Sequence, residues 1–148
     1  MVEWNPDQPV ALEALGYRSR VGIPASGLEL IQHVRRGFDY RVLVRLAESS
    51  GFSIRTLAAA LGVSAYAIRQ ARRSGRWSST QSDRLFRAAR VLSAAQVLFG
   101  GDCTLAHRWL TTPQRGLNEE PPLAWLMTDV EAQAVLDLIG RIDNGLVT

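Results

Sequence analysis

Residues 54–69 decide the fold: Ile54-Arg55-Thr56-Leu57-Ala58-Ala59-Ala60-Leu61-Gly62-Val63-Ser64-Ala65-Tyr66-Ala67-Ile68-Arg69. The first half places apolar side chains at i, i+1 and i+4, on one face of a helix, and Gly62 follows where a left-handed residue would end that helix. Ser64 is a favourable N-cap for a second helix, and Ile68 faces back toward the core. The small side chain of Ala58 lets two helices cross closely. This spacing predicts a helix-turn-helix whose recognition helix covers about residues 65–74.

The basic charge of the chain is concentrated around the same motif. Between Arg35 and Arg90, twelve arginines face three acids, whereas residues 91–148 carry three arginines and seven acids. The modest net charge of +3 therefore hides a strongly dipolar molecule. The chain has no lysine, and arginine offers phosphate and guanine a bidentate geometry that lysine lacks. A basic block beside an acidic block indicates two tasks, one of them facing a polyanion.

Helical periodicity continues on both sides of the motif, and no segment alternates over the length of a strand. The fold is therefore expected to be all α. Upstream, Leu28, Ile31 and Val34 recur at helical spacing, and Asp39 is placed to cap the next helix. Residues 1–27 are rich in proline and glycine and are expected to form a loose arm.

Downstream, two segments have the pattern of a capping box. Thr80-Gln81-Ser82-Asp83 is expected to open the longest helix, with Asp83 and Arg87 paired one turn apart. Pro122 is well placed as the first residue of a short helix. Thr128-Asp129-Val130-Glu131 is expected to open the final helix.

The polar break at Gly75-Arg76-Trp77-Ser78-Ser79 marks the expected domain junction. The predicted organisation is an arm over 1–27, a helix-turn-helix domain over 28–79 and a small helical domain over 80–148. The N-terminal bundle and the C-terminal domain are expected to be joined by the long helix.

Catalysis and membrane insertion find no support in the sequence. His33 and His107 have no cysteine or carboxylate at metal-ligand spacing, so no metal, cofactor or catalytic residue is expected, and His107 is expected to be solvated. The longest uncharged run, residues 56–68, is too short to span a bilayer. The single cysteine, Cys103, fits a reducing cytoplasm.

The C-terminal half resembles a known family. The positions that carry the resemblance are Ser82-Asp83-Arg84-Leu85-Phe86-Arg87-Ala88-Ala89-Arg90, Leu98-Phe99-Gly100, Ala106, Trp109-Leu110, Pro113, Leu117, Pro122-Leu123, Thr128, Val135, Leu138 and Arg141-Ile142-Asp143-Asn144-Gly145. In this order and spacing they resemble the Xre-type antitoxins of bacterial RES–Xre toxin–antitoxin modules. Their C-terminal domain is shared with the ParS and MbcA antitoxins.

The resemblance covers about residues 28–148 and has two departures. Glu131 stands where the family often has a glycine, and the capping-box pattern accounts for it. The recognition helix of the family often ends in paired arginines, whereas in this chain Gln70-Ala71 precedes Arg72-Arg73. The operator sequence therefore cannot be transferred from the family.

The resemblance implies a bacterial antitoxin that neutralises a RES-domain toxin, from a group associated with NAD breakdown, and represses its own operon. A homodimer is expected, since one such unit reads only a half-site. Two alternatives stay open. One is a helix-turn-helix regulator whose C-terminal domain serves only dimerisation or ligand sensing. The other is a helical adaptor whose arginines hold proteins or RNA.

Two sets of site residues follow. Those expected to face the major groove lie opposite Ile68: Ser64, Tyr66, Arg69, Gln70 and Arg73. Those expected on phosphates flank the hairpin: Arg55, Arg72 and Arg76. For any single arginine, the alternative is a solvated surface charge.

The candidate toxin-binding residues lie in the C-terminal domain, and they are Trp109, Leu138, Arg141, Ile142, Asp143 and Asn144. The alternative for the apolar ones is a place in the core. For Arg141 it is an ion pair with Asp137, one turn earlier.

Overall fold

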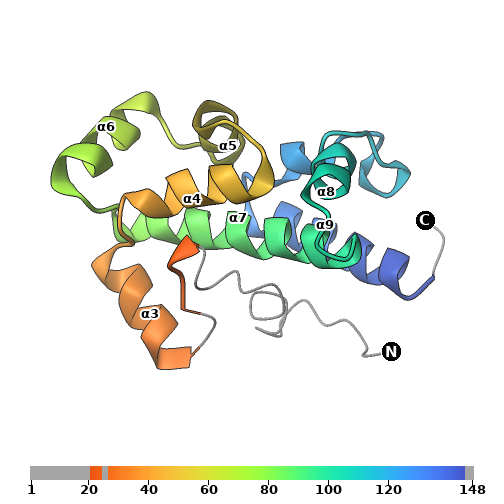
Figure 1. Cartoon of the computed structure of the whole chain (residues 1–148), viewed down its shortest axis with the longest axis horizontal. Coiled ribbons are helices and arrows are strands. Elements are labelled where there is room, and N and C mark those ends of the chain that lie inside the picture. Colours follow the sequence, from red (N-terminus) through yellow and green to blue (C-terminus); the bar gives the residue numbers. More distant parts are fainter. Residues whose placement is uncertain (1–20, 25–26, 146–148) are drawn as a thin grey trace.

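The computed structural model of the protein describes residues 21–24 and 27–145, and this part of the chain is all α, as the periodicity predicts. It contains seven α-helices and two short 3-10 helices, without a strand (Figure 1). In chain order they are α3 (Gly27–Arg36), α4 (Arg41–Ser50), α5 (Ile54–Leu61), α6 (Ala65–Ser74), α7 (Ser79–Leu98), α8 (Cys103–Leu110), η1 (Arg115–Leu117), η2 (Pro122–Trp125) and α9 (Asp129–Asp143).

Helix α7 is the longest element of the described chain and runs along the length of the molecule, with α6 near one end and α8 and α9 toward the other (Figure 1). Its second half is buried on all sides, from Ala88 through Gln96 apart from Arg90. Helices α3, α4, α5, α8 and α9 all pack against it. Many of these buried positions are alanine, which allows neighbouring helices to approach closely. The two predicted domains therefore share one continuous core.

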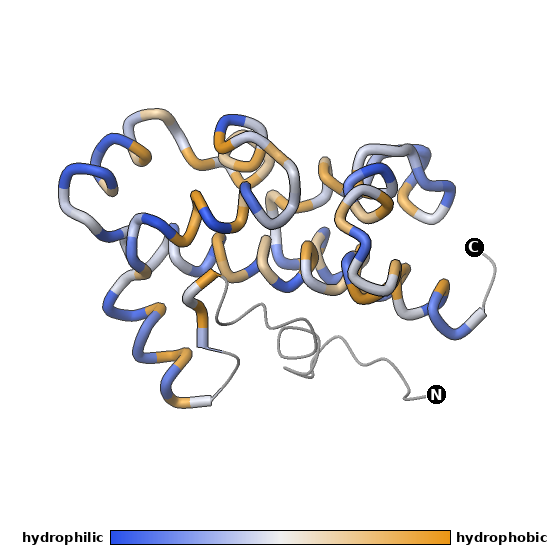
Figure 2. The backbone as a smooth tube through the Cα atoms, viewed as in Figure 1, coloured by the Kyte–Doolittle hydropathy of each residue, from blue (hydrophilic) through white to orange (hydrophobic). Residues whose placement is uncertain are grey.

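Hydropathy follows this arrangement. Figure 2 shows hydrophobic and hydrophilic positions alternating along α4 and α7, whereas much of α6 is hydrophilic. A helix with one apolar face and one polar face buries only the first. The polar outer face of α6 therefore does not pack against the core and is available to contact a partner.

The helix-turn-helix forms as predicted. Ser53 and Ser64 cap α5 and α6 by accepting hydrogen bonds from the N–H groups three residues ahead, at Thr56 (3.0 Å) and Ala67 (3.1 Å). Gly62 has a φ of 71°, in the left-handed region that ends α5. The recognition helix covers residues 65–74, as expected.

The start of the long helix differs from the prediction. Ser78 caps α7 by accepting from the N–H of Gln81 (3.1 Å), so the capping box expected at residues 80–83 is wrong. Ser82 is buried and accepts a hydrogen bond from the N–H of Phe38 (2.8 Å), which makes it a link between segments. The expected pairing of Arg87 with Asp83 is also wrong, because Arg87 Nε donates to Asp129 Oδ1 at 2.7 Å.

The N-terminal side holds a second difference. Val21 and Ile23 are fully buried in the core, so this part of the expected loose arm is packed, while residues 1–20 and 25–26 lie outside the described residues. Helix α3 forms where the apolar stripe predicts it, but Leu28 and Ile31 are exposed. Periodicity shows which residues share a face and does not show whether anything covers that face.

The C-terminal elements begin as predicted. Pro122 is the first residue of η2, and the hydroxyl of Thr128 accepts from the N–H of Glu131 (3.2 Å) to cap α9. Among the described residues, no helix combines the length and the hydropathy that crossing a bilayer requires.

Candidate DNA and partner interfaces

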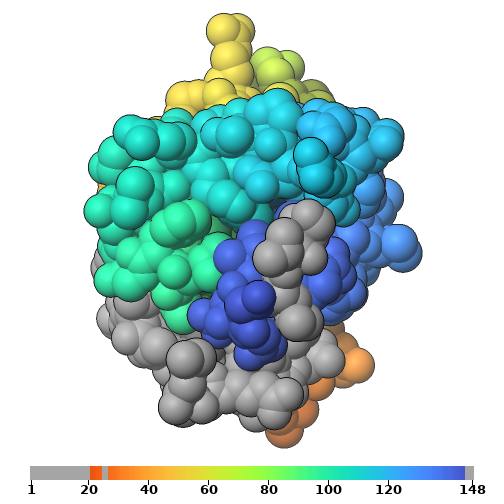
Figure 3. Space-filling view, turned by 90° about the vertical axis from the view of Figure 1, so that its right-hand side faces the viewer, coloured from red at the N-terminus to blue at the C-terminus, as the bar shows by residue number. Residues whose placement is uncertain are grey.

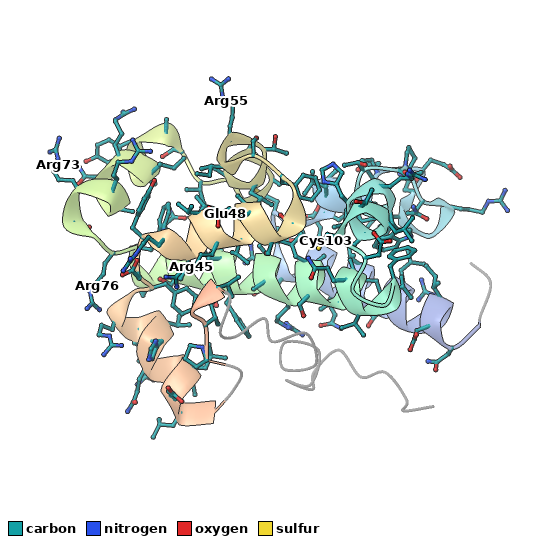
Figure 4. The ribbon with its side chains drawn as sticks, in the orientation of Figure 1. Arg45, Glu48, Arg55, Arg73, Arg76 and Cys103 are labelled. Atoms are coloured by element: carbon teal, nitrogen blue, oxygen red, sulfur yellow. The ribbon has the colours of Figure 1, made fainter. Side chains whose placement is uncertain are left out.

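Helix α6 presents most of its surface to solvent. Ala71 is its one fully buried residue, and Ala67 and Ile68 are half-buried against the core. All eight residues predicted for DNA contact are exposed: Arg55, Ser64, Tyr66, Arg69, Gln70, Arg72, Arg73 and Arg76. Figure 4 shows Arg55 and Arg73 pointing away from the body of the molecule. The structure therefore gathers this set around one helix hairpin.

Contacts within α6 define what these side chains can still bind. Gln70 Nε2 donates to the hydroxyl of Tyr66 at 2.8 Å, which fixes both side chains and leaves the amide oxygen of Gln70 able to accept from a base. Ser64 Oγ already accepts from the N–H of Ala67 (3.1 Å), so its hydroxyl proton remains for a phosphate or base acceptor.

Arg72 is held differently from the other arginines of α6. Its guanidinium lies 5.7 Å from the centroid of the Tyr40 ring, and its Nε and Nη2 donate to the Tyr40 hydroxyl, each at 3.2 Å. A cation over an aromatic face gains about 0.5–1 kcal/mol at an exposed site. Arg72 thus connects α6 to Tyr40, the residue preceding α4. A phosphate that binds Arg72 would meet its guanidinium beside the Tyr40 ring.

A groove of about 560 Å³ lies between α6 and the start of α7. Its lining includes Tyr66, Gln70, Ser74, Arg76 and Gln81. The N-terminal end of α7, through Ser78 and Gln81, and Arg76 border the same space. Both attract anions, the first through its unpaired N–H groups and the second through its charge.

Two arginines of the basic block do not serve this surface. Arg84 Nη1 donates to the carbonyl oxygen of Gly62 at 3.0 Å. Arg87 binds Asp129 and donates through Nη1 to the carbonyl oxygens of Leu126 (3.3 Å) and Met127 (3.0 Å). A count of charges does not distinguish these two arginines from those available to a polyanion. In the structure, Arg84 binds the turn after α5 and Arg87 binds the start of α9.

The candidate toxin-binding residues lie on α8 and along the last turns of α9. Figure 3 views this end of the molecule, where α8, the loop after it and the end of α9 form much of the visible surface. Arg141 and Asn144 are exposed, and Trp109, Ile142 and Asp143 are half-buried.

Leu138 requires a correction, because it is only 1% exposed. It lies on the face of α9 that packs into the core, so it cannot contact a partner while the fold is intact. The pairing of Arg141 with Asp137 is not observed in the described part of the chain, where Asp137 Oδ1 accepts from Gln133 Nε2 at 3.0 Å.

His107 also differs from expectation. Its ring is half-buried and stacked on Phe52, with centroids 4.2 Å apart, and its Nδ1 lies 3.3 Å from the carbonyl oxygen of Ser50. It therefore joins α8 to the turn after α4 and is not solvated. A small cavity of about 270 Å³ beside it is also lined by Cys103 and Thr104. Within residues 21–24 and 27–145, no three His, Cys, Asp or Glu side chains are grouped to hold a metal.

An exposed arginine-bearing recognition helix, sharing a core with a second helical domain, defines the class: a helix-turn-helix protein with a further binding domain. Residues 29–90 match the family described as the antitoxin Xre-like helix-turn-helix domain, and residues 94–145 match the antitoxin Xre/MbcA/ParS C-terminal toxin-binding domain. The two matched ranges adjoin inside α7, between residues 90 and 94.

Whole-chain similarity agrees with these matches. The chain is 34% identical over 128 residues to an antitoxin Xre of Yersinia enterocolitica, covering 85% of this chain and 86% of that protein. It is 31% identical over 130 residues to an antitoxin Xre of Photorhabdus laumondii, covering 86% and 88%. The chain belongs to the Xre family of antitoxins, with a DNA-binding helix-turn-helix and a toxin-binding domain. Membership in this family confirms that the protein is not an enzyme.

Proposed function

We propose that this antitoxin neutralises a RES-domain toxin of the group that degrades NAD, and represses its own operon by binding operator DNA through α6. The observation that carries the proposal is the separation of an exposed basic helix from an acidic toxin-binding domain on one shared core. Since we expect both proposed partners, operator DNA and toxin, in the bacterial cytoplasm, we expect the antitoxin to act there.

On the DNA side, Tyr66, Arg69, Gln70 and Arg73 recur at i, i+3, i+4 and i+7, so they share one face of α6. We assign this face to the major groove, where an arginine that contacts a guanine in bidentate fashion contributes about 1–3 kcal/mol of discrimination. Arg55 and Arg76 flank the face and are assigned to phosphates. A homodimer would present two such faces to two half-sites.

On the toxin side, we assign the exposed end of α9. Arg141 and Asn144 are exposed and Asp143 half-buried there, and Ile142 and Trp109 keep part of their apolar surface open. Toxins that act on NAD need a pocket for a charged nucleotide, and the guanidinium of Arg141 suits such a pocket. Arginine is also enriched at the energetic centres of protein interfaces.

The DNA assignment is tested by a mobility shift with a duplex from the promoter of the antitoxin's own gene. Arg69→Glu with Arg73→Glu should abolish the shift and leave the circular dichroism spectrum unchanged. The matched control is Arg108→Glu with Arg115→Glu, which makes the same change in charge at exposed positions of the other domain. Unchanged affinity in the Arg69 and Arg73 variant rejects the assignment.

The toxin assignment is tested by co-expression with the protein encoded by the neighbouring reading frame. Arg141→Ala with Asn144→Ala should lose rescue of growth and keep the promoter shift. Asp137→Ala, an exposed change on the same helix, should keep both. Full rescue by the Arg141 and Asn144 variant removes this surface from the interface. A neighbouring gene that encodes no RES domain removes the proposed partner.

A further inference from the structure

The toxin-binding domain touches the turn of the helix-turn-helix directly. Met127 Sδ lies so close to Gly62 that a Cβ added at Gly62 would be 2.6 Å from it. Arg84 Nη1 holds the carbonyl oxygen of Gly62 at 3.0 Å. One turn along α7, Arg87 holds the carbonyl oxygen of Met127 at 3.0 Å and the carboxylate of Asp129 at 2.7 Å. Two arginines of one helix thus tie the turn to the start of α9.

The recognition helix depends on this turn for its orientation. It buries only Ala71 fully, so its packing against the core is slight and its placement also depends on its two flanking connections. The carbonyl of Gly62 follows the last residue of α5, where acceptors lack partners within the helix. The bond from Arg84 satisfies this acceptor and fixes the peptide that leads into Ser64, the N-cap of α6.

The same linkage is open to solvent at its other end. The side chain of Asp129 is 78% exposed, whereas that of Arg87 is 11% exposed. Val130, the next residue of α9, is 82% exposed. The carboxylate that holds Arg87 can therefore be changed without disturbing the core.

We propose that Arg84, Arg87, Met127 and Asp129 are positioning residues through which the toxin-binding domain holds α6 in the orientation that operator binding requires. This inference rests on the proposed function, in which α6 binds operator DNA, and it adds the residues of the other domain that hold α6 in place. A change at Asp129 should therefore alter operator affinity, although Asp129 lies outside the face of α6 that is proposed to contact DNA.

The decisive variant is Asp129→Asn, because two explanations predict opposite signs. It removes a negative charge, and bare electrostatics therefore predicts equal or tighter DNA binding. Loss of the ionic character of the hydrogen bond to Arg87 loosens the linkage and predicts weaker binding to a duplex from the antitoxin's own promoter, by about three- to tenfold. Asp137→Asn makes the same charge change on the same helix, two turns away, and should bind as the wild type does. Asp129→Glu keeps a carboxylate and should restore much of the affinity.

Two further readouts separate positioning from loss of the fold. Affinity for a duplex of scrambled sequence should stay unchanged in Asp129→Asn, as should the midpoint of thermal unfolding. Hydrogen exchange without DNA should quicken at the N–H of Val63, which donates to the carbonyl oxygen of Ala58 at 2.8 Å across the turn, in both Asp129→Asn and Met127→Ala.

Promoter affinity in Asp129→Asn equal to that of Asp137→Asn, with unchanged exchange at Val63, overturns the proposed positioning role. If the wild-type protein does not bind the promoter duplex, the proposed function fails. Exchange at Val63 then tests the linkage between the turn and the start of α9 alone, since it needs no DNA.

Discussion

Replacing Gly37 by alanine tests the connection that joins the end of the recognition helix to the core. Gly37 has a φ of 98°, which side chains rarely adopt, and a Cβ there would collide with the carbonyl oxygen of Trp77. That oxygen cannot retreat easily. Trp77 is buried, its N–H donates to Phe38 (2.9 Å), and its Nε1 donates to the carbonyl oxygen of Tyr40 (3.1 Å).

The expected cost follows from these contacts. A non-glycine residue held at such a φ costs about 1–3 kcal/mol. Moving residues 37–40 away from Trp77 also weakens the two hydrogen bonds of Trp77 and the one from the N–H of Tyr40 to Gly75 (2.9 Å). Each contributes about 1 kcal/mol. The free energy of unfolding should therefore fall by about 3–5 kcal/mol, which lowers the midpoint of thermal unfolding by roughly 10 °C.

Gly75→Ala is the matched control. Its φ is 82°, yet no heavy atom lies within 4 Å of the added Cβ, so only the backbone strain applies, at about 1–2 kcal/mol. Urea unfolding of both variants, followed by circular dichroism, gives the comparison. If Gly37→Ala loses no more stability than Gly75→Ala, the contact with Trp77 is not what holds this connection.

Three further changes have defined outcomes. Hydrogen bonds from the backbone N–H of Arg41, and next from its side chain, lower the pKa of Asp39. The contribution of Asp39 to the stability of the fold is therefore complete above the unfolded pKa of about 3.9 and is lost as the pH falls through the lowered pKa. The gap in urea midpoint between wild type and Asp39→Asn should therefore close on acidification, and a constant gap would contradict this. Leu138→Ala should lower the free energy of unfolding by about 2–5 kcal/mol because Leu138 is buried, whereas Arg141→Ala, at an exposed position, should change it by about 0.5 kcal/mol or less. Similar losses in thermal unfolding would mean that Leu138 is not buried in the core. Arg55→Ala should reduce the slope of log affinity against log salt for the promoter duplex by about 1, while an unaltered slope would remove Arg55 from the phosphate contacts.

The parts of the fold that local chemistry determines were predictable. A serine N-cap and a glycine that can adopt positive φ bound α6 at residues 65–74, and the hydroxyl of Thr128 caps α9. The exposed face of α6 followed from the same periodicity, since Ile68 marks the side that turns inward. For the DNA surface, the sequence therefore sufficed to name residues that the structure exposes together.

Contacts between distant segments were not predictable in this way. Arg87 pairs with Asp129, forty-two residues away, where helix rules favoured Asp83. Trp77 is buried although it lies in the most polar break of the chain, because Tyr40 stacks on it with ring centroids 5.8 Å apart. Leu138 could be assigned to the core only once the position of α7 beside α9 was known. Periodicity groups residues by face, and only tertiary packing decides what each face meets.

If operator DNA and toxin bind at opposite ends of α7, one antitoxin molecule can hold both at the same time. The direct measurement is a mobility shift with the promoter duplex and wild-type antitoxin, to which the purified product of the neighbouring reading frame is added. We predict a slower band that contains duplex, antitoxin and toxin, and its absence with Arg69→Glu and Arg73→Glu although that variant still binds the toxin. Release of free duplex at an equimolar amount of toxin, with no slower band, would contradict two separate surfaces.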